Sequence, residues 1–141
     1  MQTFLPSKSF KTSAQMLDNK RLGKQRVEVL QILKALTIED YGWKNHPATK
    51  MWGGHINALV EYGVEICQEW RTRGFKDTCL EKIQAFQQPE LAANMPDWIE
   101  NEDVYSSHRS NLLRKDYAHY SRFNWIETKS NYEETSYVWP V

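Results

Sequence analysis

The longest helical pattern in the chain lies between a proline that suits a helix start and a glycine that suits a helix end. Apolar side chains in residues 47–73 recur at spacings of three and four, which places them on one face of a helix. Pro47 fits a first helical turn, and Gly74 follows two arginines at a typical helix end. The pattern predicts one long amphipathic helix, and the glycine pair 53–54 allows a kink near its start. Its apolar face is formed by Trp52, Ile56, Leu59, Gly63, Ile66 and Trp70.

Helical patterns also cover most of the remaining chain. Residues 19–36 are rich in helix-forming residues, and residues 102–115 have an acidic start and a basic end that match the helix dipole. Shorter helices are expected at 14–17 and 77–86, and residues 1–10 are expected to form an irregular arm. No segment alternates convincingly with period two. We therefore expect a compact, single-domain, all-α fold of 141 residues with three main helices, an irregular N-terminal arm and an aromatic C-terminal tail.

The C-terminal tail is unusually aromatic. One interpretation of residues 117–141 is an extended segment that packs back over the helices. The other is a platform on which nucleobases stack, and both can hold for different residues. The aromatic residues of the tail are Tyr117, Tyr120, Phe123, Trp125, Tyr132, Tyr137 and Trp139.

Composition excludes several classes of protein. Lys plus Arg and Asp plus Glu both number 18, so any nucleic-acid site must be a local basic patch rather than a basic coat. Two cysteines are too few for a disulfide framework, and no zinc-ligand spacing is present, so we expect neither a metal nor another cofactor. No apolar run is long enough for a membrane span or a signal peptide. We therefore expect a cytoplasmic protein with no membrane partner.

Polar side chains interrupt the apolar stripe of the 19–36 helix. On a helical wheel Arg26 falls inside the stripe, and Gln25 lies at its edge in line with Arg21 and Glu28. A charged group that faces the core is costly unless it is paired or lines a cleft. These residues are therefore predicted to face a polar pocket, or else Arg26 makes a structural salt bridge with a distant acid. Lys24 lies on the outer side, as does Lys20, where solvation and phosphate contact are the two alternatives.

Several histidines and aromatic residues suggest a pocket. His55 and His108 fall on apolar helix faces, and His46 lies at a helix start, where backbone donors attract anions. The first two are hydrogen-bonded core residues, or all three converge with Lys50 on one site that needs a general acid or base at neutral pH. Trp52 or Trp43 is a candidate for base stacking, although core packing is the alternative for Trp52. Near the end of the last main helix, Arg109, Arg114 and Lys115 either contact phosphates or form a solvated face.

These residues together carry a resemblance to a known family. The Arg21-x4-Arg26-Val27 stretch, the Arg73-Gly74-Phe75 helix end and the aromatic tail resemble the pyrimidine-dimer DNA glycosylase family, whose members are similar to bacteriophage endonuclease V. The resemblance implies a compact all-α protein that acts on ultraviolet-damaged DNA and flips a base out of the duplex. It also implies that the N-terminal amine attacks the sugar and forms a Schiff base. A glutamate in the first long helix then assists before β-elimination cuts the strand.

The sequence departs from the family pattern at two places. The family exposes its amine by removing the initiator Met ahead of a small residue, but Gln2 is too large for that removal, so the amine is expected on Met1. Where the family has its glutamate, this chain has the run 23–25, and Glu28 one turn later is the candidate substitute. Arg26 matches the family's DNA-contacting arginine best.

The resemblance predicts a DNA-repair N-glycosylase and AP lyase that acts on damaged or modified pyrimidine bases in duplex DNA. One alternative is a nucleotide- or nucleic-acid-binding protein of the same fold without lyase chemistry. Another is a different activity on a nucleotide or modified base. The sequence leaves the oligomeric state open. The catalytic candidates are Met1, Glu28 and His55, and the binding candidates are Arg21, Lys24, Gln25, Arg26, His46, Lys50, Trp52, His108, Arg109, Arg114 and Lys115.

Overall fold

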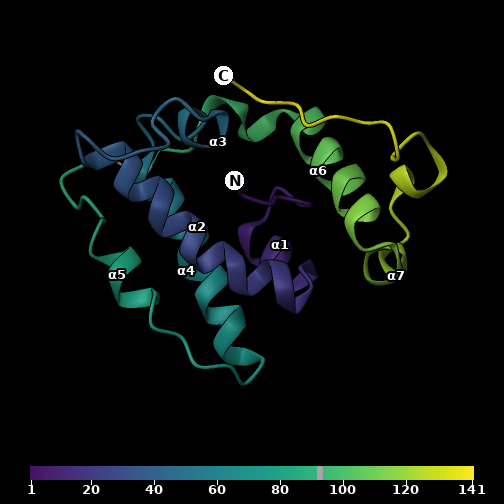
Figure 1. Cartoon of the computed structure of the whole chain (residues 1–141), viewed down its shortest axis with the longest axis horizontal. Coiled ribbons are helices and arrows are strands. Elements are labelled where there is room, and N and C mark those ends of the chain that lie inside the picture. The colour runs from purple at the N-terminus through teal and green to yellow at the C-terminus, as the bar shows by residue number, and fades with distance from the viewer. Residues whose placement is uncertain (92–93) are drawn as a thin grey trace.

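The regular elements of the computed structural model, which describes residues 1–91 and 94–141, are all helices, so the all-α prediction is confirmed (Figure 1). Within these residues no helix is long and apolar enough to cross a membrane. The α-helices are α1 (Phe10–Met16), α2 (Asn19–Thr37), α3 (Pro47–Lys50), α4 (Ile56–Thr72), α5 (Leu80–Gln84), α6 (Glu102–Lys115) and α7 (Tyr117–Tyr120). Short 3-10 helices are η1 (Asp97–Glu100), η2 (Ser121–Phe123) and η3 (Ile126–Lys129).

The predicted helix over residues 47–73 is interrupted, so its prediction as one element is wrong. The chain leaves the helical path after α3 and enters α4 only at Ile56, because Gly54 adopts φ 79°, which α-helices do not allow. The predicted end is confirmed, since Gly74 follows α4 with φ 92°. The 102–115 helix has the predicted bounds, whereas the first short helix begins earlier, at Phe10.

The centre of the molecule is the crossing of α2 and α4, with α1 and α5 packed beside α4 (Figure 1). The two long helices approach closely at two glycines. A Cβ at Gly63 would lie 2.7 Å from Val29 Cγ1, and one at Gly23 would lie 2.8 Å from the Trp70 ring. The crossing therefore fixes how α2 presents its polar residues.

The N-terminal arm has no regular secondary structure, but its residues 2–6 are buried. Its backbone hydrogen bonds are made with side chains: the Phe4 amide donates to Gln25 Oε1 (3.0 Å), and the Leu5 amide donates to His108 Nδ1 (2.9 Å). The Thr3 hydroxyl accepts from Trp52 Nε1 at 3.0 Å. These bonds let an extended segment lie in the core without unpaired amides, and they fix the place of the chain's first residue.

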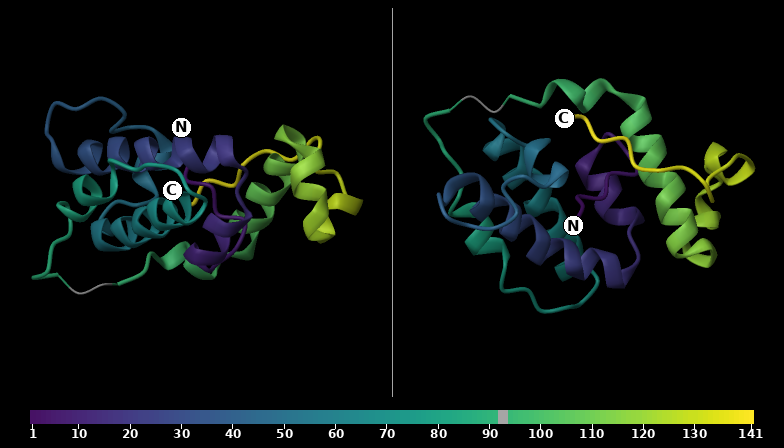
Figure 2. Two further views of the ribbon diagram at one scale, coloured as in Figure 1. Left: turned by 90° about the horizontal axis from the view of Figure 1, so that it is seen from below. Right: turned by 45° about the horizontal axis from the view of Figure 1, so that its top comes forward.

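The C-terminal tail packs back over the helices. It crosses α6 and ends near α3 (Figures 1 and 2). The Val138 amide donates to Ser107 Oγ (3.0 Å), and Arg114 Nη1 donates to the Thr135 carbonyl (3.2 Å). Both ends of the chain thus reach the same side of the α2 helix.

Candidate functional site

A pocket of about 280 Å³ lies where the N-terminal arm, α2, the end of α6 and the tail meet. We call it the amine pocket, because the first residue of the chain lines it. Its walls combine cationic, carboxylate and aromatic groups, which is the mixture that an amine-based reaction on a nucleic acid requires. The lining residues are Met1, Gln2, Phe4, Lys20, Arg21, Lys24, Gln25, Glu28, Lys115 and Tyr137.

Helix α2 supplies the polar floor. Asp18 caps the helix by accepting from the Arg21 amide, and the following side chains at Arg21, Gln25 and Glu28 are spaced by four and three residues. That spacing places them on one helix face. The predicted alignment of these three residues is therefore found in the structure, and the face points at the N-terminus.

The surroundings of Glu28 shift the pKa of its carboxyl in both directions. Burial raises the pKa of its carboxyl, while the positive charges of the N-terminal amine and Lys24 and a backbone hydrogen bond from Gln2 lower it; the balance leaves the pKa above its usual value. Gln25 Nε2 donates to Glu28 Oε2 at 2.6 Å. A partly buried carboxyl of this kind exchanges protons closer to neutral pH than a solvated one.

Gln25 holds the pocket together. It is fully buried, and its amide oxygen accepts from the Phe4 amide (3.0 Å) and the Tyr62 hydroxyl (2.9 Å). Its amide nitrogen donates to the Gln2 carbonyl (2.9 Å) and to Glu28. Because both ends of the amide are bonded within the protein, Gln25 acts on the arm and on Glu28 rather than on a ligand.

Four cationic side chains surround the mouth of the amine pocket. Arg21 lies 3.3 Å from the carboxylate of Asp18, which also accepts from the Tyr120 hydroxyl. Lys115 reaches the pocket from the end of α6; burial and the charge of Arg21 lower its pKa. The four cations are Lys20, Arg21, Lys24 and Lys115. They form a local basic patch in a chain with no net charge.

His46 lies within range of the charge of the N-terminal amine, although it does not line the amine pocket. Its Nδ1 accepts from the Ala48 amide (3.0 Å) and so caps α3, which fixes the orientation of the ring. Burial lowers the pKa of His46, and the positive charge of the amine lowers it further. The ring is therefore neutral near pH 7, with its remaining proton on Nε2.

A comparison with models of protein families shows which family the chain belongs to. A model of the family described as pyrimidine dimer DNA glycosylase matches residues 1–82. The chain belongs to this family. No curated protein and no solved structure matches it. Family membership supports a DNA-repair glycosylase with a DNA substrate. The matched part of this glycosylase includes Met1, the polar face of α2 and His46, whereas Lys115 and Tyr137 lie beyond it.

Three arginines of the glycosylase are bound to internal partners. Arg26 lies 2.6 Å from Asp77, whose side chain is 0% exposed, and stacks over the Trp70 ring at 4.6 Å. Arg109 lies 2.8 Å from Glu127, and Arg114 holds carbonyls of the tail. For Arg26 this is the structural salt bridge that the sequence left as an alternative.

The histidines and Lys50 do not converge. His108 is fully buried behind Phe4 and Tyr137; burial, with a smaller effect of Arg109, lowers its pKa to about 3. His55 Nδ1 lies 3.3 Å from the Asn94 carbonyl in a separate pocket of about 200 Å³. Lys50 is exposed at the end of α3. None of these four residues lines the amine pocket, and the charge of the N-terminal amine affects the pKa of His46.

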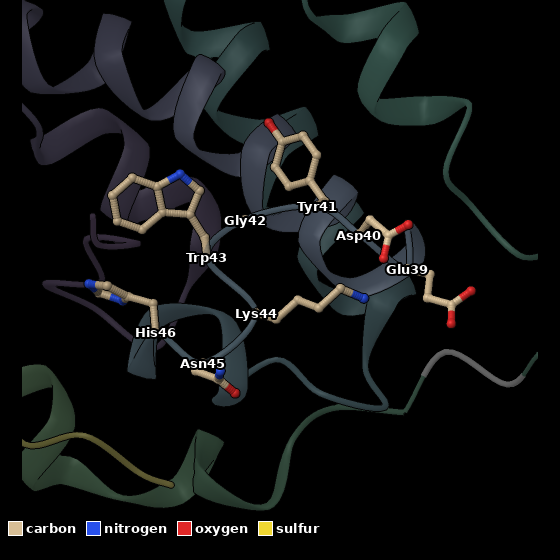
Figure 3. Close-up of a pocket in the computed structure, with 8 residues that line it drawn as sticks. All are labelled: Glu39, Asp40, Tyr41, Gly42, Trp43, Lys44, Asn45 and His46. Carbon is tan, nitrogen blue, oxygen red and sulfur yellow. The ribbon is translucent and has the colours of Figure 1, made fainter.

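Trp52 is fully buried in the core, which is one of the two alternatives that the sequence left open for it. Two further features were not predicted from the sequence. Tyr137 of the tail lines the amine pocket. A second hollow of about 500 Å³ lies within the loop over residues 39–46, with Trp43 at its edge (Figure 3). No local pattern assigns a tail residue to a pocket formed mainly by α2, because that contact depends on the path of the whole chain.

Among the described residues, no three His, Cys, Asp or Glu side chains form a group that could hold a metal ion.

Proposed function

We propose that this glycosylase removes damaged pyrimidine bases from duplex DNA with the α-amine of Met1 as nucleophile, and then cuts the strand as an AP lyase. The observation that carries the proposal is that the N-terminus and Glu28 line one pocket together with four cationic side chains. The first residue is fixed by the hydrogen bond from Gln25 to the Gln2 carbonyl. An amine held beside a carboxyl is the arrangement that Schiff-base chemistry requires.

The reaction proceeds in balanced steps. The Met1 nitrogen forms a bond to C1′ while the glycosidic bond breaks. The electron pair of the glycosidic bond leaves with the base, which takes up a proton. The proton lost by the amine passes to Glu28, whose raised pKa suits it to accept and return protons. Ring opening, with protonation of O4′, gives the Schiff base. Loss of a C2′ proton then expels the 3′ phosphate by β-elimination.

The cations of the amine pocket are proposed to bind the DNA backbone on either side of the damaged nucleotide. Phosphate contacts release counterions, so four such contacts give a slope of log affinity against log salt of about −3.6. A neutral His46 adds a donor at Nε2 without adding charge.

Borohydride trapping tests the proposed nucleophile. Duplex DNA with a thymine dimer is incubated with the protein and borohydride, and the adduct is digested with trypsin for mass spectrometry. We expect the adduct on the peptide over residues 1–8. An adduct on Lys115, a lysine of the pocket whose pKa is lowered by burial and the charge of Arg21, would overturn the assignment of the nucleophile to Met1.

A pair of glutamate variants tests the carboxyl. Glu28→Gln is expected to slow trapping by about 100-fold or more, the usual range for loss of a general acid or base. Glu81→Gln changes an exposed carboxylate on α5 and serves as the matched control. Binding of damaged DNA with no trapping in the wild-type protein would favour the alternative of a binding protein without lyase chemistry.

A further inference from the structure

The loop over residues 39–46 exposes an indole in a costly backbone conformation. Trp43 has φ 71° and is 53% exposed, and it lies at the edge of the hollow shown in Figure 3. A bulky residue rarely adopts a positive φ, and such conformations concentrate at functional sites. A glycine would relieve the cost, so the large exposed side chain needs an explanation other than stability.

Aromatic rings connect Trp43 with the amine pocket. The Trp43 and His46 rings lie 5.8 Å apart, and His46 lies 5.8 Å from Trp139. Trp139 lies 5.5 Å from Tyr137, which lines the amine pocket. We call these four residues the aromatic wall. It extends from the proposed reaction site to the exposed indole.

The wall is fixed in place. The His46 amide donates to the Trp43 carbonyl (3.1 Å), and His46 Nδ1 is bonded to the Ala48 amide. The rings of Trp43 and His46 meet at 68° instead of stacking, and over half of the surface of residue Trp43 is open to solvent. The backbone at Trp43 and its neighbouring ring are therefore held in place, while the indole remains accessible to another flat ring.

We propose that Trp43 is a base-stacking residue, which packs against a nucleobase that loses its stacking neighbour when a nucleotide leaves the duplex at the amine pocket. This inference rests on the proposed function. Extrusion of a nucleotide costs stacking energy, and an aromatic side chain beside the gap repays part of it for any base, because every base has a π face. Lys44, next in the loop, adds a cation for the neighbouring phosphate.

Equilibrium binding to two duplexes tests the inference. One duplex carries a tetrahydrofuran analogue of an abasic site, which leaves a gap in the stack and cannot form a Schiff base, and the other is intact. Trp43→Gly is expected to lower affinity for the gapped duplex by about tenfold and to change affinity for the intact duplex little. Trp43→Phe should retain most of the preference. Ile126→Ala, at a 79% exposed apolar residue of η3, is the matched control.

A melting curve separates stacking from a structural role. Because glycine adopts positive φ freely, the melting temperature of Trp43→Gly should not fall. Equal affinity of Trp43→Gly and wild type for the gapped duplex, or equal losses on both duplexes, overturns the inference. Absence of borohydride trapping by the wild-type protein is a separate result, which refutes the proposed lyase activity. A preference for the gapped duplex that depends on Trp43 would still support the stacking role.

Discussion

Replacing Gln25 with leucine should destabilise the fold and disable the amine pocket together. The leucine fills a similar volume but cannot form hydrogen bonds. The Phe4 amide and the Gln2 carbonyl, which both bond to Gln25 and lie in a buried segment, then lose their partner. Each buried group left unpaired costs about 1–3 kcal/mol, so the two together cost about 2–6 kcal/mol. The Tyr62 hydroxyl contributes less to the loss, because it still donates to the Phe4 carbonyl at 2.7 Å.

Urea denaturation measures the predicted loss in the free energy of unfolding. The state of the pocket is measured by the rate of borohydride trapping, under conditions where the variant remains folded. The arm loses the bond that fixes Gln2, so trapping should fall even in folded protein. Val27→Ala, at a 46% exposed residue of the same helix, should change the free energy of unfolding by less than about 0.5 kcal/mol. A Gln25→Leu variant that unfolds within about 0.5 kcal/mol of wild type and traps DNA normally would refute the role of Gln25 in holding the arm.

Three further predictions concern the packing and charges of α2 and its neighbours. Gly63→Ala should cost about 1–3 kcal/mol in thermal unfolding, because the new Cβ would lie 2.7 Å from Val29 Cγ1; an unchanged melting temperature would contradict this. Asp77→Ala should cost about 3 kcal/mol in urea, because it leaves Arg26 without its buried partner. Burial alone would raise the pKa of Asp77, but hydrogen bonds from Arg26 and two backbone amides hold it below its usual value. The carboxylate therefore stabilises the fold above pH 4, and this stability is lost as pH falls through the lowered pKa; the acid limb of stability against pH should flatten in Asp77→Asn.

The helical wheel identified the inward-facing polar residues of α2 but could not identify their interaction partners. Arg26 was correctly expected to point inward, because its position in the apolar stripe depends only on local periodicity. Its partner Asp77 lies 51 residues away, and no local pattern reveals a contact over that distance. The same wheel aligned Gln25 with Glu28, yet the Gln25 amide is used entirely by the arm and its neighbours.

The interrupted helix explains why the histidines could not be grouped from the sequence. A continuous helix over 47–73 would have placed His55 on a face shared with Leu59 and Tyr62. The positive φ of Gly54 instead turns the chain before α4, so His55 bonds toward Asn94 while His46 caps α3. The break at Gly54 therefore leaves His55 at the start of α4 instead of inside a continuous helix.

The amine pocket depends on segments from opposite ends of the chain, and this affects how its function can be altered. The family match ends at residue 82, so the amine and Glu28 belong to the matched part, while Lys115 and the aromatic wall's Tyr137 and Trp139 come from later residues. Changes at Glu28 of α2 or at Met1 of the arm act on the proton transfers. Changes in the tail leave the hydrogen bonds of Gln25 intact and act on what the pocket admits. Substitutions in the tail should therefore change the preference among damaged bases more than the rate of Schiff-base formation on a natural abasic site, and comparing the two rates in Tyr137→Ala separates these contributions.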